Sequence, residues 1–266
     1  MSSLLLSSPL DILAIAAHRD DVEQTCGGTL LKAAQRGQHT GILDLTQGEM
    51  GTRGTAEDRA REAEDAAKLL GVGWRRALDL PDGRVENTWE NRLKVASVIR
   101  ETRARVIILP YWKGRHPDHY TASVLGYEAC FLAGLAKLDP QKALGSQLSS
   151  VSDPTSELRS QTSHLAPHRP FKIIYATLYY DIRPSFVIDI DQQFEGKFAS
   201  ILAYKSQFSD QDAGKDLFPA HHQIRARIEA MARFYGMLGG VTYAEPFLQK
   251  EVGLVDDLLA IPVKSI

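Results

Sequence analysis

The chain has little cysteine and no long hydrophobic run. Its 266 residues include only 2 cysteines, Cys26 and Cys130, too few for a disulfide-rich scaffold and typical of a reducing compartment. No apolar run approaches the ~20 residues that a membrane-spanning helix needs. A signal peptide is disfavoured because no Lys or Arg precedes the first apolar stretch, which Pro9 and Asp11 interrupt. We therefore expect a cytoplasmic protein with no membrane partner.

The chain also lacks an excess of charge of one sign. Its 31 Lys and Arg residues nearly balance its 33 Asp and Glu residues, so there is no basic surface of the kind that binds nucleic acid. Hydrophobic residues make up 44% of the chain, which excludes an intrinsically disordered protein. We expect a single domain over residues 1–266, because α/β domains commonly reach this size.

Short apolar segments alternate with helical patterns in the first half of the chain. Near-continuous apolar runs are typical of strands that are covered on both faces. The expected elements are strands at 11–17, 40–45, 75–80 and 106–109 and helices at 29–36, 55–70 and 89–103. This alternation predicts a parallel sheet with right-handed crossovers. The expected fold is a doubly wound, Rossmann-like, three-layer α/β domain with a mostly parallel sheet.

The second half is less regular. Residues 137–170 are rich in Ser, Gln, Thr and Pro and have no apolar period, which predicts a flexible loop that is either a functional lid or a tolerated surface insertion. Two more strands are expected after it, at 172–180 and 185–190, followed by helices at 194–204 and 223–237.

Imidazoles and carboxylates follow two of the expected strands. One cluster, residues 18–21, comes after the first strand, and the other, residues 116–119, follows the strand that ends at Leu109. Ligands of an open parallel sheet bind beyond the carboxyl ends of its strands, so the two clusters could converge there. A lone His at a strand end is usually structural, but two His/Asp clusters at one edge favour a zinc site.

A spacing of three residues indicates which side chains could act together. On a turn that enters a helix, positions i and i+3 can face the same side, which pairs His18 with Asp21 and His116 with His119. Three of these four side chains could hold a catalytic zinc and leave one position open. Asp20 would then be a spare carboxylate beside the metal, able to act as a general base, although Asp is also a common helix N-cap.

The two motifs together resemble those of the LmbE/PIG-L family of zinc-dependent N-acetylglucosaminyl deacetylases. The family signatures, A-H-x-D-D after the first strand and H-P-D-H after a later one, stand here at 17–21 and 116–119. The likeness extends over residues 11–247. Arg19 departs from the family, which commonly has Pro there. Since it lies between ligands rather than among them, we expect it to be tolerated, although a cation there could alter substrate preference.

The resemblance implies a metal centre. It implies one zinc ion per chain, bound by His18, Asp21 and His119, with Asp20 as the general base that activates water. A sugar-binding protein without activity would not need this spare carboxylate, which argues against such a function.

The resemblance also implies roles for four further residues. It gives His116 the task of stabilising the oxyanion, with Asp118 orienting His116 and keeping it charged. Arg59 and Arg115 match positions suited to holding substrate carboxylates. Arg59 could instead pair with a glutamate of its own helix.

Within the family, the chain is most similar to the branch that makes bacillithiol by removing acetyl from N-acetylglucosaminyl-malate. The segments that suggest this branch are 109–119, 186–190, 203–208 and 243–245. The expected partner is thus a small amino-sugar conjugate, and the resemblance also implies a homo-oligomer, either a trimer or a hexamer. A related conjugate, linked to inositol, lipid or an antibiotic, is an open alternative.

Two other enzyme classes fit the sequence less well. A dinucleotide-binding domain needs G-x-G-x-x-G after its first strand, whereas Gly48, Gly51 and Gly54 have the wrong spacing and follow the second strand. A two-metal phosphoesterase usually needs more ligands than these motifs provide.

Overall fold

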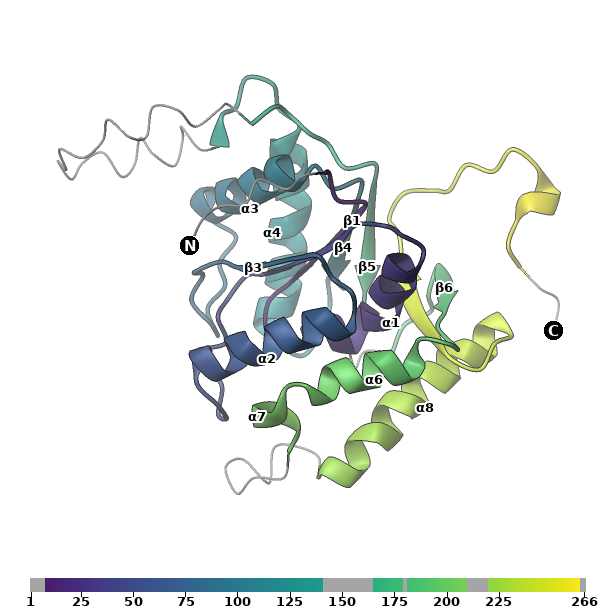
Figure 1. Cartoon of the computed structure of the whole chain (residues 1–266). Coiled ribbons are helices and arrows are strands. Elements are labelled where there is room, and N and C mark those ends of the chain that lie inside the picture. Colours follow the sequence, from purple (N-terminus) through teal and green to yellow (C-terminus); the bar gives the residue numbers. More distant parts are fainter. Residues whose placement is uncertain (1–7, 141–164, 179–180, 210–219, 264–266) are drawn as a thin grey trace.

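The protein folds around one sheet with helices on both faces (Figure 1). The computed structural model describes residues 8–140, 165–178, 181–209 and 220–263. Its strands are β1 (Ile12–Ala16), β2 (Thr40–Asp44), β3 (Trp74–Ala77), β4 (Val106–Pro110), β5 (Lys172–Ala176), β6 (Phe186–Asp189) and β7 (Ala244–Leu248). Its helices are α1 (Asp21–Gln35), α2 (Ala56–Leu69), α3 (Trp89–Thr102), α4 (Pro117–Ala133), α6 (Phe194–Leu202), α7 (Lys205–Phe208), α8 (His221–Gly239) and the 3₁₀ helix η2 (Leu258–Ala260).

The sheet is mostly parallel, which confirms the predicted fold class. The strand order is β3-β2-β1-β4-β5-β7-β6, and the five strands from β3 to β5 are parallel. The other two are antiparallel: β7 pairs with β5 and β6 pairs with β7. Most of the loop predicted at 137–170 lies outside the described residues. None of the described helices has the length and apolar character that crossing a bilayer requires.

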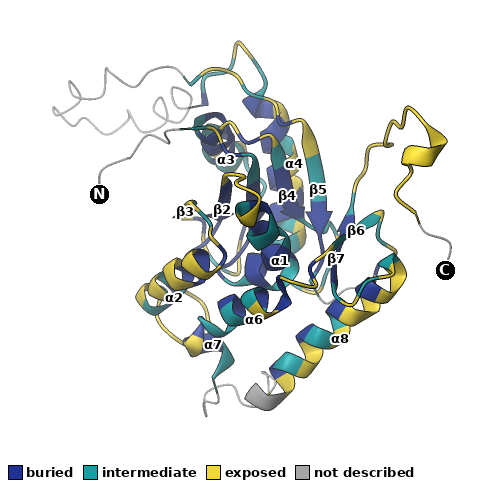
Figure 2. Ribbon diagram, turned by 45° about the vertical axis from the view of Figure 1, so that its right-hand side comes forward, coloured by how far each residue is buried: buried dark blue, intermediate teal, exposed yellow. Residues whose placement is uncertain are grey.

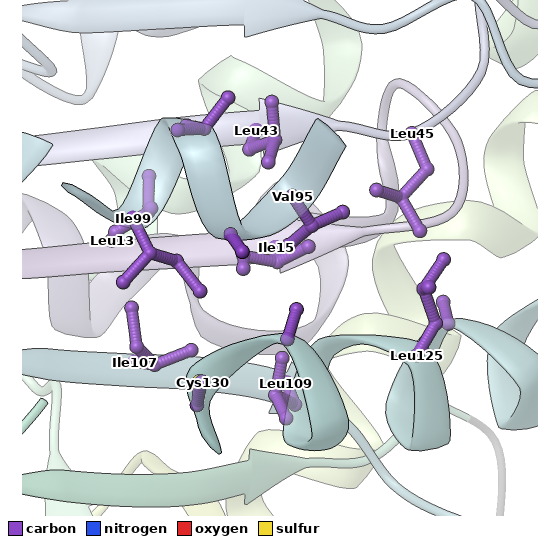
Figure 3. Packing of buried hydrophobic residues seen from close by; sticks show 14 of the residues in the cluster. Leu13, Ile15, Leu43, Leu45, Val95, Ile99, Ile107, Leu109, Leu125 and Cys130 are labelled. Carbon is purple, nitrogen blue, oxygen red and sulfur yellow. The ribbon is translucent and has the colours of Figure 1, made fainter. Parts of the chain in front are cut away.

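The residues of β1 supply both faces of the core. Leu13 and Ile15 point to the face covered by α3 and α4, and Ala14 and Ala16 point to the face covered by α1, because side chains alternate along a strand. The larger of the two clusters is shown in Figure 3, which labels Leu13, Ile15, Leu43, Leu45, Val95, Ile99, Ile107, Leu109, Leu125 and Cys130. The small alanines leave room for α1 close to the sheet.

Two helices next to the motifs differ from the expectation. The helix expected at 29–36 begins at Asp21 instead, since its first turns are polar and contain two adjacent glycines, which weaken the helical pattern. The pattern does not predict α4 as a helix, because apolar residues lie on all its sides and no period of 3.6 residues stands out.

Helix α1 is interrupted at Cys26, and a buried carboxylate caps the second part. Cys26 has φ −142° and ψ 19°, outside the helical range. The carboxylate of Glu245 in β7 accepts hydrogen bonds from the backbone N–H groups of Gly28 (2.9 Å) and Thr29 (2.7 Å). The ammonium of Lys197 in α6 pairs with the same carboxylate, and both side chains are almost completely buried. The contact joins three elements that are distant in sequence.

A second buried ion network holds the first part of α1. Arg75 in β3 donates to both carboxylate oxygens of Asp44 (2.8 and 3.0 Å) and to Glu23 of α1 (2.6 Å). The hydroxyl of Tyr204 donates to the same Glu23 oxygen at 3.1 Å. Charged hydrogen bonds therefore fix α1 on both sides of its break.

We expect Glu245→Ala to lower the free energy of unfolding by about 3 to 5 kcal/mol, because it leaves the Lys197 charge buried without a partner and two N–H groups unpaired. Urea denaturation followed by circular dichroism measures the change. The matched control is Glu251→Ala, at an exposed position, which should stay within about 0.5 kcal/mol of the unsubstituted protein. Equal stability of the two variants would contradict the role given to Glu245.

Candidate active site

The two motifs meet at one edge of the sheet. β1 and β4 are hydrogen-bonded neighbours, so their carboxyl ends lie side by side. His18 and Asp21 follow β1, and His119 lies in the first turn of α4, after β4. The sheet order therefore brings together side chains that are 101 residues apart in the sequence.

The donor atoms of three predicted ligands, His18, Asp21 and His119, lie close together, and we call these three side chains the triangle. His18 Nδ1 lies 3.2 Å from His119 Nε2 and 3.4 Å from one carboxylate oxygen of Asp21. The other Asp21 oxygen lies 3.2 Å from His119 Nε2. In a tetrahedral zinc site with bonds of about 2.0 Å, ligand atoms are about 3.3 Å apart. The pairwise distances match this spacing, although Asp21 uses a different oxygen toward each histidine. Among the described residues, two sets of three side chains place one ligand atom each within 4.8 Å of the others: His18 with His116 and His119, and His18 with Asp82 and Asp118.

The electrostatics of the triangle favour a positive charge. Burial raises the pKa of the Asp21 carboxyl, but His119 and His18 outweigh burial and hold that pKa well below its usual value. Burial lowers the pKa of His119, yet Asp21 raises it above the usual value. The site stabilises a cation, whether that cation is a proton or a metal ion.

Two carboxylates contact the far side of the His18 ring. His18 Nε2 lies 3.1 Å from an oxygen of Asp82 and 3.2 Å from an oxygen of Asp118. The backbone N–H groups of Gly83 and Val85 hold the Asp118 carboxylate in place. Burial lowers the pKa of His18, but its hydrogen bonds with these carboxylates and Asp21 raise it to about 12.

Asp82 is a site residue that the sequence analysis missed. It lies in the turn after β3, and its second carboxylate oxygen accepts from the backbone N–H of Met50 at 2.9 Å. The rule that ligands bind beyond the carboxyl ends of parallel strands, applied to β3 as well as to β1 and β4, would have identified it.

The expected pairing of Asp118 with His116 is wrong. The Asp118 carboxylate faces His18, and His116 Nδ1 instead accepts the backbone N–H of Asp118 at 3.2 Å as the N-cap of α4. Burial and the neighbouring His18 and His119 lower the pKa of His116. With Nδ1 accepting, the neutral ring carries its proton on Nε2 and can donate it. The ring lies beside the triangle, 4.6 Å from the His18 ring between centroids.

Asp20 lies next to the triangle in a left-handed backbone conformation, with φ 93°. One carboxylate oxygen is 3.0 Å from Arg59 Nη2, and the other accepts from the Gln24 side-chain amide at 3.2 Å. Burial raises the pKa of Asp20 to about 7, although Arg59 opposes this. Asp20 stands at the N-cap position of α1, but its side chain makes no capping hydrogen bond, so helix capping does not account for it.

The two predicted substrate arginines have different surroundings. Arg59 is buried, and it donates to Asp20 and to the backbone carbonyl of Arg19 rather than pairing with a glutamate of its helix. Gly48 has φ +74°, and a Cβ there would lie 2.4 Å from Arg59 Nη1, so the loop after β2 needs glycine at this point. Arg115 is exposed, and its guanidinium has no ion pair with any described residue.

The Arg19 side chain points to the loop rather than to the triangle. Its guanidinium donates to the carbonyls of Gln47 (3.2 Å) and Ala56 (2.7 Å), which ties the loop after β2 to the start of α2. This position explains how the motif accommodates Arg between its ligands.

A small pocket adjoins the triangle. It has a volume of about 30 Å³, and both Asp21 and His119 line it. Its other walls include apolar side chains such as Val22, Cys26 and Ile108. Such a cavity holds about two water-sized spheres, or a group the size of a methyl.

Comparisons with known proteins identify the family of the chain. Residues 13–130 match the family model for PIG-L, described as GlcNAc-PI de-N-acetylase. Diacetylchitobiose deacetylase of Thermococcus kodakarensis is 30% identical over 245 residues, which cover 88% of this chain and 80% of that protein. Among solved structures, the conserved protein TT1542 of Thermus thermophilus has a TM-score of 0.75 and 36% identity, over 93% of this chain and 98% of that chain. N,N'-diacetylchitobiose deacetylase of Pyrococcus horikoshii has a TM-score of 0.71 and 25% identity, over 89% and 82%. The chain therefore belongs to the PIG-L family and is an N-deacetylase.

Proposed function

We propose that the protein is a zinc-dependent hydrolase that removes the acetyl group from an N-acetylglucosaminyl conjugate, with one zinc ion held by His18, Asp21 and His119. The observation that carries this proposal is that each pair among these three side chains has donor atoms 3.2 to 3.4 Å apart. The acetylated amino sugars in the names of the family model and of the Thermococcus relative support the substrate class. Both cysteines are free and buried, which fits the proposed cytoplasmic location.

Each residue around the zinc site has a separate role in the hydrolysis of the amide bond. When bound, zinc supplies a Lewis acid for the acetyl carbonyl and for the attacking water. Asp20, beside the ligands, takes the proton from that water and returns it to the leaving amine. His116 donates a hydrogen bond from Nε2 to the developing oxyanion. Asp82 and Asp118 fix the orientation of the His18 ring through its Nε2.

The small pocket beside the triangle supports acetyl as the group removed, because its apolar walls suit the acetyl methyl.

We further propose N-acetylglucosaminyl-malate, of bacillithiol biosynthesis, as the conjugate. Malate carries two carboxylates, and the exposed Arg115 guanidinium directly precedes His116 and can bind one of them. The charge of Arg59 is already paired with Asp20, so Arg59 has a smaller share in this contact. An acetylated chitooligosaccharide is the second candidate, supported by the name of the Thermococcus relative.

Incubation of the pure enzyme with a panel of N-acetylglucosaminyl conjugates, with and without a chelator, tests the reaction. The panel contains the malate conjugate, diacetylchitobiose and the free sugar, and released amine is measured. We expect the chelator to abolish amine release and added zinc to restore it. Turnover that withstands complete metal removal would contradict the proposal.

His119→Ala should lose most of the bound metal, because it removes one of three ligands. Elemental analysis should give close to one zinc per chain for the unsubstituted protein. The control is His39→Ala, at an exposed position away from the site, which should keep its zinc. A fully loaded His119→Ala protein would remove His119 from the ligand set.

Asp20→Asn should lower kcat at least about 10²-fold and retain zinc, since Asn keeps the size of the side chain but cannot accept the proton. Asn also tolerates the positive φ at this position, so the fold should be unaffected. Loss of zinc from this variant would instead make Asp20 a ligand.

Arg115→Ala should raise KM for the malate conjugate about tenfold and leave KM for the free sugar unchanged, because it removes a charge-assisted contact to the aglycone. Arg59→Ala should instead lower kcat for both substrates, since it removes the partner of Asp20. Arg36→Ala, at an exposed position on α1's C-cap, serves as the control. Equal kcat/KM of the unsubstituted enzyme for conjugate and free sugar would exclude the malate branch and leave the deacetylase intact.

A further inference from the structure

The small pocket beside the triangle has a cation in its wall. Two of its lining residues, Asp21 and His119, belong to the triangle, and a third is Lys113. Among the described residues that line the pocket, Lys113 is the one Lys or Arg. Lys113 is exposed, whereas most of the other lining residues are buried, so it belongs to the mouth of the pocket. None of the steps proposed for the hydrolysis uses Lys113.

The charge of Lys113 is available to a ligand. No described residue forms an ion pair, a hydrogen bond or a cation–π contact with its ammonium. Other cations next to the site are engaged by the protein itself: Arg59 pairs with Asp20, and Arg19 donates to two backbone carbonyls. A cation that lines a pocket and has no partner in the protein favours a negatively charged ligand there.

The backbone that leads to Lys113 is held in place. Lys113 lies in the loop between β4 and α4, and β4 pairs with β5, whose carboxyl end is buried (Figure 2). The N–H of Tyr111 donates to the carbonyl of Ala176 in β5 at 2.7 Å. The Trp112 ring packs edge-on against the Tyr175 ring, with 4.7 Å between centroids. Lys113 therefore follows a fixed segment, and only its own side chain has to move to reach a ligand.

The pocket has open space beside Lys113. Gly114 also lines it, and a Cβ added to Gly114 would meet no heavy atom within 4 Å apart from its two neighbours in the chain. The inner walls are apolar and include Val22, Cys26 and Ile108. An apolar interior with a cation at the mouth fits a small carboxylate that carries a methyl group.

Removal of an acetyl group produces such a molecule. Hydrolysis breaks the amide C–N bond, forms a C–O bond from water and passes a proton to the amine, so the acetyl group leaves as acetate. The acetyl group of the substrate is neutral, whereas acetate carries one negative charge at neutral pH. A cation at the pocket mouth therefore binds the product more strongly than the acetyl group of the substrate.

We propose that Lys113 binds the carboxylate of the acetate product, with the acetate methyl in the apolar pocket. The proposal rests on the proposed removal of acetyl, since that reaction supplies the acetate. A carboxylate of the aglycone is the other possible source of negative charge. The pocket favours acetate as the ligand of Lys113, because Arg115, which is proposed to bind the aglycone, is not among the described residues that line it.

Inhibition of the zinc-loaded enzyme by acetate and by acetamide tests the proposal. Acetamide has the methyl and carbonyl groups of acetate but no charge. At constant ionic strength, we expect Lys113→Met to raise the inhibition constant of acetate about fivefold and to leave that of acetamide unchanged, because only a charge-assisted contact is lost. Lys113→Arg should retain the acetate inhibition of the unsubstituted enzyme. The matched control is Lys172→Met, exposed at the amino end of β5, which should change neither constant.

A binding measurement separates this proposal from the proposed function. Saturation-transfer NMR on the methyl signal of acetate, with zinc-loaded protein and no substrate, does not depend on turnover. Weaker acetate binding by Lys113→Met would support the role of Lys113 even if no conjugate of the panel released amine, a result that would contradict the proposed function alone. Amine release by the unsubstituted enzyme together with equal acetate binding by both proteins would overturn the role of Lys113 alone.

Two further outcomes would overturn the proposal. An equal change in inhibition by acetate and by acetamide would mean that Lys113 shapes the pocket rather than binding a charge. A higher KM for the malate conjugate, with acetate inhibition unchanged, would assign Lys113 to the aglycone instead. Circular dichroism and zinc content verify the fold and the metal site of each variant, and Lys113→Gln replaces Lys113→Met if that variant fails to fold.

Discussion

The buried carboxylate of Glu245 is the contact on which the arrangement of the site depends. It lies 217 residues from the backbone N–H of Gly28 in sequence, and it joins β7 and α6 to the helix that starts with Asp21. A helix break in the interior would otherwise leave N–H groups without acceptors. Lys197 balances the negative charge in the same place, so α1 can change direction at Cys26 and still be held in place next to His18 and Asp21.

In the candidate site, charged side chains surround the imidazole of His18. His18 faces the triangle with Nδ1 and two carboxylates with Nε2, so both of its nitrogen atoms have negatively charged neighbours. Asp20 and Arg59 form the next layer, and the glycine loop after β2 closes over Arg59. Each group is fixed by a neighbour that is itself hydrogen-bonded, and such an arrangement keeps reactive groups in place before the substrate arrives.

Much of the fold and of the candidate site could be predicted from the sequence, because the patterns that indicate them are local. Apolar strands and the residues directly after them are visible as short patterns, and β1, β4 and the two His/Asp clusters were predicted in this way. The partner of Asp118 could not be predicted, since it depends on the direction of a side chain and on a residue 100 positions away. Helix α4 was missed because a helix that is apolar on both faces has no amphipathic period.

The backbone at Asp20 has a consequence for how such a protein can change over time. Only Asp, Asn and Gly occupy a left-handed conformation at little cost, so these three residues can replace one another there with the fold intact. A gene duplicate released from selection for turnover could exchange Asp20 for Asn by a single substitution and keep His18, Asp21 and His119. Such a descendant would carry nearly the whole family signature. Under the role proposed for Asp20, exchange at this one position would remove turnover and leave the fold unchanged.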